Sequence, residues 1–154
     1  MKIKRIFVTQ GSSPYKTIEW EKRTAEIKSD KGEVLFRQKD VKVPKSWSDN
    51  ALNIVASKYF KENSKSPQRE KGVDQLIDRV VDTITKWGVR DKLFTKTDGE
   101  VFSDELKYIL ANQMGAFNSP VWFNVGISSP PQASACFIQS LEDTMESILG
   151  LTVK

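Results

Sequence analysis

Residues 73–88 read VDQLIDRVVDTITKWG, and this stretch carries the clearest structural signal in the sequence. Its apolar residues recur every three or four positions, which places them on one face of an α-helix. The pattern predicts an amphipathic helix packed against a core, and Gly88 is expected to end it. The polar, proline-containing stretch 63–70 before it is expected to be a loop. The apolar positions of the helix are Val73, Leu76, Ile77, Val80, Val81, Ile84 and Trp87.

Two further helices are expected on either side of this one. Ser48 is a suitable N-cap for a helix whose apolar stripe runs over residues 52–60. A third helix is expected after Gly99, with Ser103 as its N-cap, and it should end near Gly115. Three helices with apolar faces can bury those faces against one another, so a helical core is expected.

The first part of the chain shows the signals of a β-hairpin. Residues of about 18–29 and 33–38 read as two strands, and the turn formers at 30–32 suit the connection between them. Residues 41–44 should also be extended, because the residue before a proline avoids the helical region. The opening stretch 3–8 is compatible with a short strand or with a disordered arm.

The character of the sequence changes after the third helix. Residues 117–126 are dense in aromatic, amide and turn-forming side chains, and residues 128–131 read as a loop. The apolar run 135–138 suits a buried strand, and a helix is expected to start near Asp143. A lone strand and helix cannot bury both faces of a parallel strand, so the domain is expected to continue past Lys154 in a longer precursor or a partner chain. The fold class is therefore α+β.

Composition narrows the function classes. The 154 residues carry a net charge of +4, but acidic and basic residues are interleaved, so a solvated mixed-charge surface is favoured over nucleic-acid binding. The N-terminus has only a short apolar patch, and no stretch approaches the roughly 20 apolar residues of a membrane span. A cytoplasmic protein without membrane contact is expected. The absence of histidine removes Ser-His-Asp and Cys-His catalysis and most zinc sites, so no metal site is expected.

Cys136 is the only cysteine, so an intrachain disulfide is impossible. A single cysteine between alanine and phenylalanine is most often a small buried hydrophobe. No basic neighbour marks a lowered thiol pKa, and the residues alone therefore favour a structural role for Cys136 over a reactive one.

Two other groups of polar residues are candidates for ligand contacts. Ser119, and Ser134 with Ala135, could hold a phosphate through hydroxyl and backbone N–H groups, although ordinary turn chemistry is the more frequent role of such residues. Asp143 and Thr144 stand where a helix is expected to begin, and capping is their more frequent role.

Three motifs follow one another in a fixed order: FNSPVWFNVG (117–126), PQASACFI (131–138) and EDTMESI (142–148). Upstream of them stand the stretches 38–44, 47–48, 56–60 and 76–84. Together they resemble the N-terminal portion of the adenosylcobalamin-dependent (class II) ribonucleotide reductases. Long motifs in a fixed order are far more specific than one short pattern.

The resemblance implies a fold and a chemistry. Residues 1–115 would form the family's N-terminal domain, and residues 116–154 would begin its ten-stranded α/β barrel. The family reduces ribonucleotides, here expected to be diphosphates, after adenosylcobalamin homolysis generates a thiyl radical on a finger-loop cysteine. That radical abstracts the ribose 3′ hydrogen. Two further cysteines then supply the electrons and become a disulfide, and by motif match Cys136 is the first of this pair.

The resemblance also assigns binding residues and partners. Ser119, Ser134 and Ala135 match residues that line the substrate's phosphate and ribose, and Asp143 and Thr144 match the site of a deoxynucleotide effector at a dimer interface. The expected partners are therefore the ribonucleotide, the effector, the remaining part of the reductase, a second copy of the complete enzyme and a thioredoxin-like reductant.

The other required cysteines lie past the last residue of this sequence in the family pattern. The isolated chain is therefore expected to be inactive, because one thiol cannot both carry a radical and form an intramolecular disulfide. The alternatives are a stand-alone nucleotide-binding or regulatory module without catalysis, and a nonfunctional truncated remnant.

Overall fold

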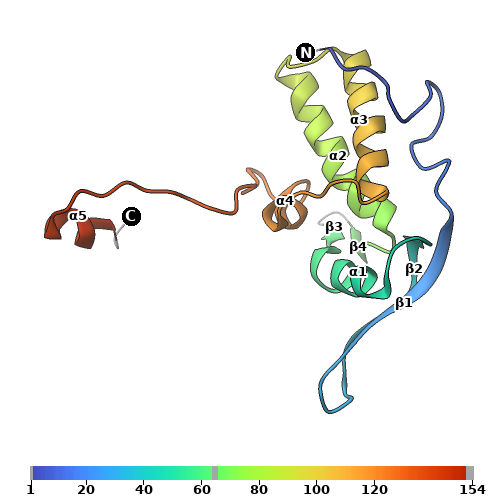
Figure 1. Ribbon diagram of the computed structural model, residues 1–154, viewed down its shortest axis with the longest axis horizontal. Coiled ribbons are helices and arrows are strands. Elements are labelled where there is room, and N and C mark those ends of the chain that lie inside the picture. Colours follow the sequence, from blue (N-terminus) through green and yellow to red (C-terminus); the bar gives the residue numbers. More distant parts are fainter. Residues whose placement is uncertain (1, 64–65, 152–154) are drawn as a thin grey trace.

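A two-stranded hairpin and a pair of long helices dominate the structure, a computed structural model that describes residues 2–63 and 66–151 (Figure 1). The α+β class predicted from the sequence is confirmed. In chain order the elements are β1 (Trp20–Lys28), β2 (Val34–Pro44), α1 (Asp49–Ile54), the π-helical turn η1 (Val55–Tyr59), β3 (Glu62–Asn63), β4 (Ser66–Arg69), α2 (Val73–Arg90), α3 (Lys96–Ala111), α4 (Ser119–Asn124) and α5 (Met145–Gly150).

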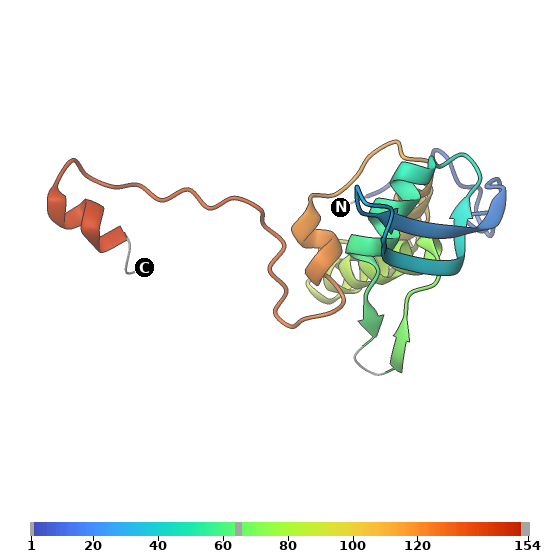
Figure 2. The ribbon, with the colours of Figure 1, turned by 90° about the horizontal axis from the view of Figure 1, so that it is seen from below.

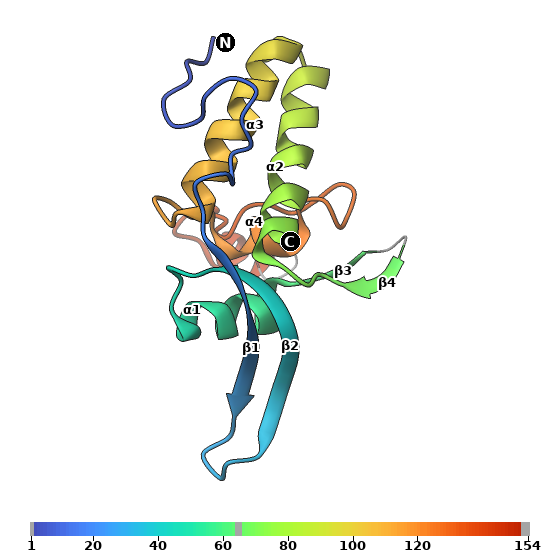
Figure 3. The same cartoon turned by 90° about the vertical axis from the view of Figure 1, so that its right-hand side faces the viewer.

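The predicted hairpin is confirmed. Strands β1 and β2 pair antiparallel, from Trp20 opposite Pro44 at one end to Lys28 opposite Val34 at the other. Gly32 in the turn has a φ of 82°, which glycine adopts without strain. Strand β2 is longer than predicted, because it takes in the extended stretch that precedes Pro44. Figure 3 shows the turn of the hairpin projecting away from the helices, while its other end lies against α1.

The first helix begins as predicted. The backbone N–H of Ala51 donates to Ser48 Oγ at 3.1 Å, so Ser48 is the N-cap of α1. The helix then widens into η1, where the N–H of Phe60 donates to the carbonyl of Val55 at 3.2 Å, five residues back. Phe60 itself is extended, so the chain leaves the helix at this point.

The helix α2 is confirmed, but Gly88 does not end it. The helix continues to Arg90, and Gly88 is buried within its last turn. A Cβ atom at position 88 would lie 2.0 Å from Cζ of Phe94, so glycine is required here for close packing. The prediction of a stop was wrong because a glycine near a helix end can serve packing as well as termination.

The predicted start of the third helix was also wrong. The N-cap of α3 is Thr95, eight residues before the position predicted for it, and its hydroxyl accepts a hydrogen bond from the N–H of Asp98 at 3.1 Å. Gly99 lies in the first turn, where a Cβ would come within 2.8 Å of the Val89 side chain. The two helices therefore approach each other closely at their joined ends. Helix α3 ends at Ala111, before the predicted position.

The core lies where the inner end of the hairpin, α1, η1, α2 and the end of α3 meet. Trp47 connects these parts, because its buried ring N–H donates to the carbonyl of Ala111 at 2.9 Å. Burial of side chains of this size supplies most of the driving force for folding. The buried apolar residues of this cluster are Ala25, Val41, Val43, Trp47, Leu52, Ala56, Phe60, Val73, Leu76, Ile77, Val81, Leu110 and Ala111.

The N-terminal stretch is neither a strand nor a disordered arm. It is an irregular segment that lies along α3. Arg5 forms an ion pair with Asp104 at 2.7 Å, and the ring of Phe7 stacks on Tyr108 with the ring centroids 5.1 Å apart. These contacts join residues nearly one hundred positions apart in the sequence, so this N-terminal arm (residues 3–8) is fixed by tertiary contacts rather than by local structure.

Glu105 on α3 is the main anchor of the N-terminal arm. Its side-chain oxygens accept the backbone N–H groups of Phe7 and Val8 at 3.0 Å each. Burial of the carboxyl raises its pKa, but the N–H groups of Phe7, Val8 and Ile6 and the charge of Arg5 outweigh this effect and hold the pKa of Glu105 below its ordinary value. The ionised carboxylate is therefore the form that binds the arm.

The stretch 63–70 was predicted to be a loop, and for most of it that prediction was wrong. Strands β3 and β4 pair antiparallel and form a second, small hairpin, while residues 64–65 lie outside the described residues. The N–H of Lys42 donates to the carbonyl of Lys71 at 2.9 Å, which joins the end of β2 to the chain that enters α2.

The chain after α4 runs away from the helices to α5, as Figures 1 and 2 show from two directions. The loop predicted over 128–131 is confirmed, but the strand predicted over 135–138 is not formed. A strand needs a neighbour for its N–H and C=O groups, and the described residues place no strand beside this stretch. The predicted helix near Asp143 is present as α5, which begins two residues later.

Candidate functional site

Ser119 is the first residue of α4, and its hydroxyl lies 3.0 Å from the hydroxyl of Tyr59. Asn118 precedes it as the N-cap residue without a side-chain capping bond, and Pro120 fits the first turn because it needs no N–H partner there. The side chain of Ser119 is exposed. The sequence prediction that the stretch is rich in turns was incomplete, because six of its residues form a helix.

Aromatic contacts hold α4 against the rest of the fold. The ring of Phe123 stacks on Tyr59 with 5.0 Å between centroids. The indole N–H of Trp122 donates to the carbonyl of Phe117 at 3.0 Å, and these two rings meet edge to face. The same Tyr59 thus contacts both Ser119 and Phe123, which fixes the start of α4 relative to η1.

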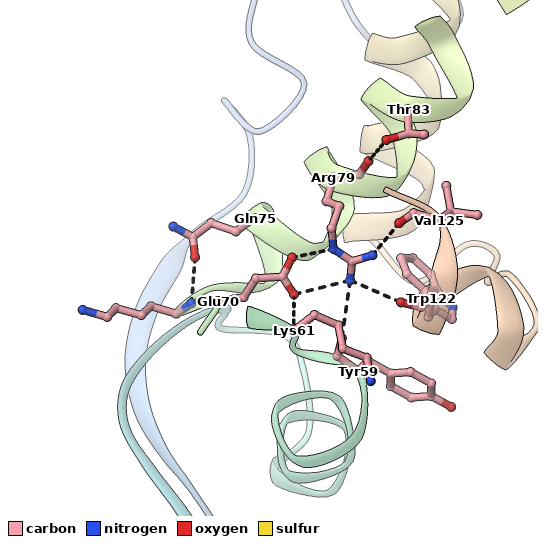
Figure 4. Close-up of polar contacts among 9 residues, drawn as sticks. Tyr59, Lys61, Glu70, Gln75, Arg79, Thr83, Trp122 and Val125 are labelled. Carbon is pink, nitrogen blue, oxygen red and sulfur yellow. Dashed lines mark hydrogen bonds and ion pairs between the residues drawn. The ribbon is translucent and has the colours of Figure 1, made fainter. Parts of the chain in front are cut away.

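Arg79 of α2 is the central residue of a network that ties α4 to the second hairpin (Figure 4). Its Nε donates to Oε1 of Glu70 at 2.7 Å, and both side chains are only 12% exposed. Its Nη1 donates to the carbonyl of Val125 at 2.6 Å, and its Nη2 donates to the carbonyls of Trp122 at 3.2 Å and Tyr59 at 3.4 Å. One guanidinium therefore binds main-chain atoms of η1 and of α4 together.

The carboxylate of Glu70 is fully used in this network. It accepts from Arg79 and also from the backbone N–H of Lys61 at 3.0 Å, so it fixes the chain on both sides of the second hairpin. Gly126 makes the close approach possible, because a Cβ there would lie 2.7 Å from Cγ of Arg79. Arg79 and Glu70 are thus positioning residues for the segment that carries Ser119.

A cavity of about 380 Å³ lies beside this network, between α1, η1, α2, the end of α3 and the chain that leads into α4. A volume of this size is in the range that small molecules fill. Its lining is mainly aromatic and aliphatic, and Tyr59 and Trp122 belong both to this lining and to the support of α4. The other lining residues are Trp47, Ala51, Val55, Leu76, Ile77, Leu110, Gln113, Gly115, Ala116 and Phe117.

Cys136 lies in the extended stretch between α4 and α5, and its side chain is exposed. The role favoured by the residues alone, a buried core cysteine, is therefore wrong for this structure. Ser134 and Ala135 beside it are exposed as well, so these three residues form an accessible segment. The structure does not bring this segment together with Ser119, because the chain runs away from the helices after α4 (Figure 2).

Thr144 is the N-cap of α5, with its hydroxyl accepting the N–H of Ser147 at 3.2 Å. Ser147 in return accepts the N–H of Glu142 at 3.0 Å through its own hydroxyl. The capping role expected of Thr144 is thus confirmed, and Asp143 is exposed beside it. Both residues lie at the start of α5, at the far end of the chain segment that runs away from α4 (Figure 1).

Sequence reasoning missed Tyr59, Glu70 and Arg79 as supports of the site. Arg79 stands on the polar face of a helix and Glu70 in a stretch expected to be a loop, so neither differs from an ordinary surface residue. The one available signal was Gly126, whose position after an aromatic segment indicates a close approach of the backbone to another element.

Within the described residues, no group of three or more aspartate, glutamate, cysteine or histidine side chains could hold a metal ion. Nor is any of the helices in that part of the chain long and apolar enough to cross a membrane.

Comparison with known proteins identifies a family that this chain matches. Residues 21–113 match a family described as class II vitamin B12-dependent ribonucleotide reductase. The chain is 49% identical over 151 residues to a vitamin B12-dependent ribonucleotide reductase of Streptomyces clavuligerus, an alignment that covers 97% of this chain and 16% of the relative.

Proteins of the same name from more distant organisms are also similar. The identity is 43% over 171 residues for the one from Rhodopirellula baltica, covering 92% of this chain and 16% of the relative. It is 33% over 214 residues for the one from Agrobacterium fabrum, covering 98% and 17%. The chain thus spans about one sixth of the length of these curated relatives.

Proposed function

Since the chain belongs to the class II vitamin B12-dependent ribonucleotide reductase family, we propose that it forms the N-terminal part of an enzyme that reduces ribonucleotides to deoxyribonucleotides. The family match covers the hairpin and the helices α1 to α3. The alignments to relatives extend over nearly the whole chain, including the segment with Ser119 and Cys136. We propose ribonucleoside diphosphates as the substrates of the enzyme and the cytoplasm as its compartment.

The proposal divides the chain at the end of α3. Residues 1–115 form an N-terminal domain, and residues 116–154 begin the catalytic α/β barrel. The apolar side chains after residue 136 support this division, because six large ones are more than 40% exposed and suit a surface that further protein covers. That covering surface would be the remaining part of the reductase, in the same or in another chain. The six residues are Phe137, Ile138, Leu141, Met145, Ile148 and Leu149.

The observation that carries the chemical proposal is the exposed thiol of Cys136. Thiol–disulfide exchange requires an accessible sulfur and a second sulfur within bonding reach. In the proposed reaction two thiols lose two electrons and two protons and form one disulfide. The ribonucleotide gains them and releases its hydroxyl as water, which leaves a deoxyribonucleotide. Cys136 supplies one thiol, the remaining part of the reductase supplies the other, and a thioredoxin-like dithiol restores both.

Ser119 and the pair Ser134–Ala135 are the proposed substrate contacts. Two observations support this role for Ser119: its side chain is exposed, and its hydroxyl has a fixed place at the start of α4. A hydroxyl that the surrounding structure already holds loses little conformational entropy when it binds a ligand. Ser134 and Ala135 would offer a hydroxyl and backbone N–H groups next to the reactive thiol. Both groups suit the phosphate and ribose oxygens of a nucleotide.

Asp143 and Thr144 are the proposed effector contacts, at an interface between two copies of the complete enzyme. The Thr144 hydroxyl is only partly free to bind a ligand, because it already accepts a hydrogen bond from the N–H of Ser147 in the cap of α5. A deoxynucleotide effector would therefore bind through Asp143 and through the remaining hydrogen-bonding capacity of the Thr144 hydroxyl.

The cofactor implied by the family is adenosylcobalamin, and the described residues do not form a site for it. Two cavities of the described part measure about 520 Å³ each, a size for small ligands, whereas a corrin with its nucleotide is much larger. Cofactor contacts are therefore proposed for the remaining part of the reductase.

The test is reconstitution of the enzyme from this chain and the region that its relatives carry after the aligned part. The joined protein is assayed for deoxynucleotide formation with adenosylcobalamin and a dithiol. Cys136→Ser should abolish multiple turnover and leave nucleotide binding intact, whereas Ser119→Ala should weaken that binding by about 1 kcal/mol, the scale of one hydrogen bond. Ser140→Ala in the same exposed segment is the matched control and should change neither turnover nor nucleotide binding.

Full turnover in Cys136→Ser would refute the proposed role of Cys136 as a reducing thiol. Nucleotide binding without turnover in every form of the protein would favour a stand-alone nucleotide-binding module.

A further inference from the structure

Arg69 and Lys71 lie between two cavities at the junction of the two hairpins and α2. One cavity, of about 520 Å³, extends along α2 and includes the Arg79–Glu70 pair. The other, of about 450 Å³, lies against β2, and we name it the basic cleft. Its lining residues are Phe36, Arg37, Gln38, Lys39, Asp40, Arg69 and Lys71.

The basic cleft has an excess of positive charge. Among the side chains that the structure describes, which leave out those of residues 62–68, four cations and one carboxylate line it, and of the four only Arg37 pairs with a carboxylate, that of Glu26 on β1. No carboxylate among these described side chains lies within 4.0 Å of the charged groups of Lys39, Arg69 or Lys71. A concave surface lined by charge of one sign attracts ions of the opposite sign more strongly than a flat one.

The acidic residues of the neighbouring cavity do not compensate this charge. Glu70 is bound to Arg79, and Asp78 and Asp82 both bind Lys107 of α3, at 2.9 and 2.8 Å. Each of these carboxylates is thus neutralised by a cation that does not line the basic cleft. Lys39 and Lys71 thus keep positive charge that no described carboxylate neutralises, and this charge is available to a ligand.

Two buried polar atoms in the basic cleft lack a hydrogen-bond partner: Nε of Arg69, a donor, and Oε1 of Gln38, an acceptor. Arg69 is nevertheless fixed, because its Nη2 donates to the carbonyl of Ala56 at 2.7 Å and its guanidinium lies 5.4 Å from the ring centre of Phe36. A buried donor without a partner costs free energy, and a bound acceptor removes that cost.

We propose that the basic cleft is a binding site for an anion with a diphosphate group. A diphosphate offers several acceptor oxygens and a charge that matches Lys39, Arg69 and Lys71, and both lysine and arginine bind phosphate well in proteins. The unpartnered Nε of Arg69 gains an acceptor in this arrangement. The site is separate from the proposed substrate contacts, because it includes neither Ser119 nor the segment of Cys136.

The test is calorimetric titration of the 154-residue chain with inorganic pyrophosphate. Saturable binding is expected, and it should weaken as the salt concentration rises. Lys71→Gln should weaken binding about tenfold, the scale of one hydrogen bond to a charged group, and a double Lys39→Gln/Lys71→Gln variant should weaken it further. Lys16→Gln is the matched control, because it removes the same charge from an exposed lysine that lines neither cavity. Circular dichroism melting establishes that each variant is folded.

Two further titrations separate this site from the proposed function and identify the source of the diphosphate. Pyrophosphate binding that Lys71→Gln leaves unchanged and Ser119→Ala weakens would assign the binding to the substrate contacts and overturn the proposal. A titration with ADP decides the source: tighter binding than pyrophosphate with the same Lys71 dependence indicates a nucleotide, and weaker binding indicates the free anion. An equal effect of Lys71→Gln and Lys16→Gln, or no saturable binding, would overturn it as well.

Discussion

Replacement of Arg79 by alanine should be among the most destabilising single changes on the polar face of α2. The change removes five donated hydrogen bonds of 2.6–3.4 Å, two to Glu70 and one each to Val125, Trp122 and Tyr59. It also leaves the Glu70 carboxylate, which is 12% exposed, without its cation. Removal of one partner from a buried ion pair costs about 3–5 kcal/mol, and we expect a value at the lower end because Glu70 keeps the N–H of Lys61.

The assay is urea or thermal unfolding followed by circular dichroism. For a chain of this size a loss of about 3 kcal/mol corresponds to a fall of roughly 6–12 °C in Tm. Arg90→Ala is the matched control, because Arg90 ends the same helix, is exposed and pairs with the adjacent Asp91, so little change is expected. A double Arg79→Met/Glu70→Leu variant should recover part of the loss, since it leaves no uncompensated charge.

The same variants have a local readout. Arg79 holds the carbonyls of Trp122 and Val125, so backbone amides of residues 119–125 should exchange with solvent faster in Arg79→Ala, while those in the middle of α3 should not. If Arg79→Ala unfolds at the same temperature as Arg90→Ala and its α4 amides stay protected, the network does not position the segment that carries Ser119.

Three other predictions follow from single contacts. The N-terminal arm should stay bound above the ordinary carboxyl pKa of 4.5 and be released as the pH falls through the lower folded pKa of Glu105, because only the ionised carboxylate binds the arm. The NMR shift of the Phe7 amide between about pH 6 and 2 measures this release. Release that starts above about pH 6 would contradict the prediction. Gly88→Ala should destabilise by about 1–3 kcal/mol in urea unfolding although alanine favours helices, because its Cβ would overlap the Phe94 ring, and a gain in stability would refute the close packing. Ser48→Ala should cost about 1 kcal/mol through loss of the α1 cap, whereas an unchanged urea midpoint would show that the cap contributes nothing.

The sequence alone was sufficient to predict those elements whose signal lies in neighbouring residues. The three-to-four periodicity predicted α2, the serine before an apolar stripe predicted the cap of α1, and the turn formers around Gly32 predicted the hairpin. Each of these signals lies within one element, so no knowledge of the neighbouring elements was needed. The α+β class follows from the same three elements.

The errors arose where a residue type serves two purposes. Gly88 and Gly99 were taken as boundaries of helices, yet both lie inside helices. The missing Cβ of Gly88 leaves room for the Phe94 ring of the connection, and that of Gly99 leaves room for the Val89 side chain of α2. The true cap of α3 was present in the sequence as Thr95 with Asp98 three residues later, a recognised capping pattern. The predicted strand at 135–138 required a neighbouring strand, which a local pattern cannot supply.

The candidate site was predictable only in part. The motif match selected Ser119, Cys136 and Thr144, and the structure places them on an exposed helix start, an exposed extended segment and a helix cap. The supporting pair of Arg79 and Glu70 was not predictable, because Glu70 stands at the end of a stretch expected to be a loop and meets Arg79 only once that stretch has folded against α2.

The N-terminal arm also has a consequence for the order of events during synthesis. Arg5 and its partner Asp104 are 99 residues apart, and Phe7 and Glu105 are 98 residues apart. At translation rates of about 5–20 residues per second, the arm leaves the peptidyl-transferase centre roughly 5–20 s before the helix that binds it has been made. During that interval the exposed Phe7 and Ile6 are available to chaperones, and docking of the arm marks the completion of the helical domain.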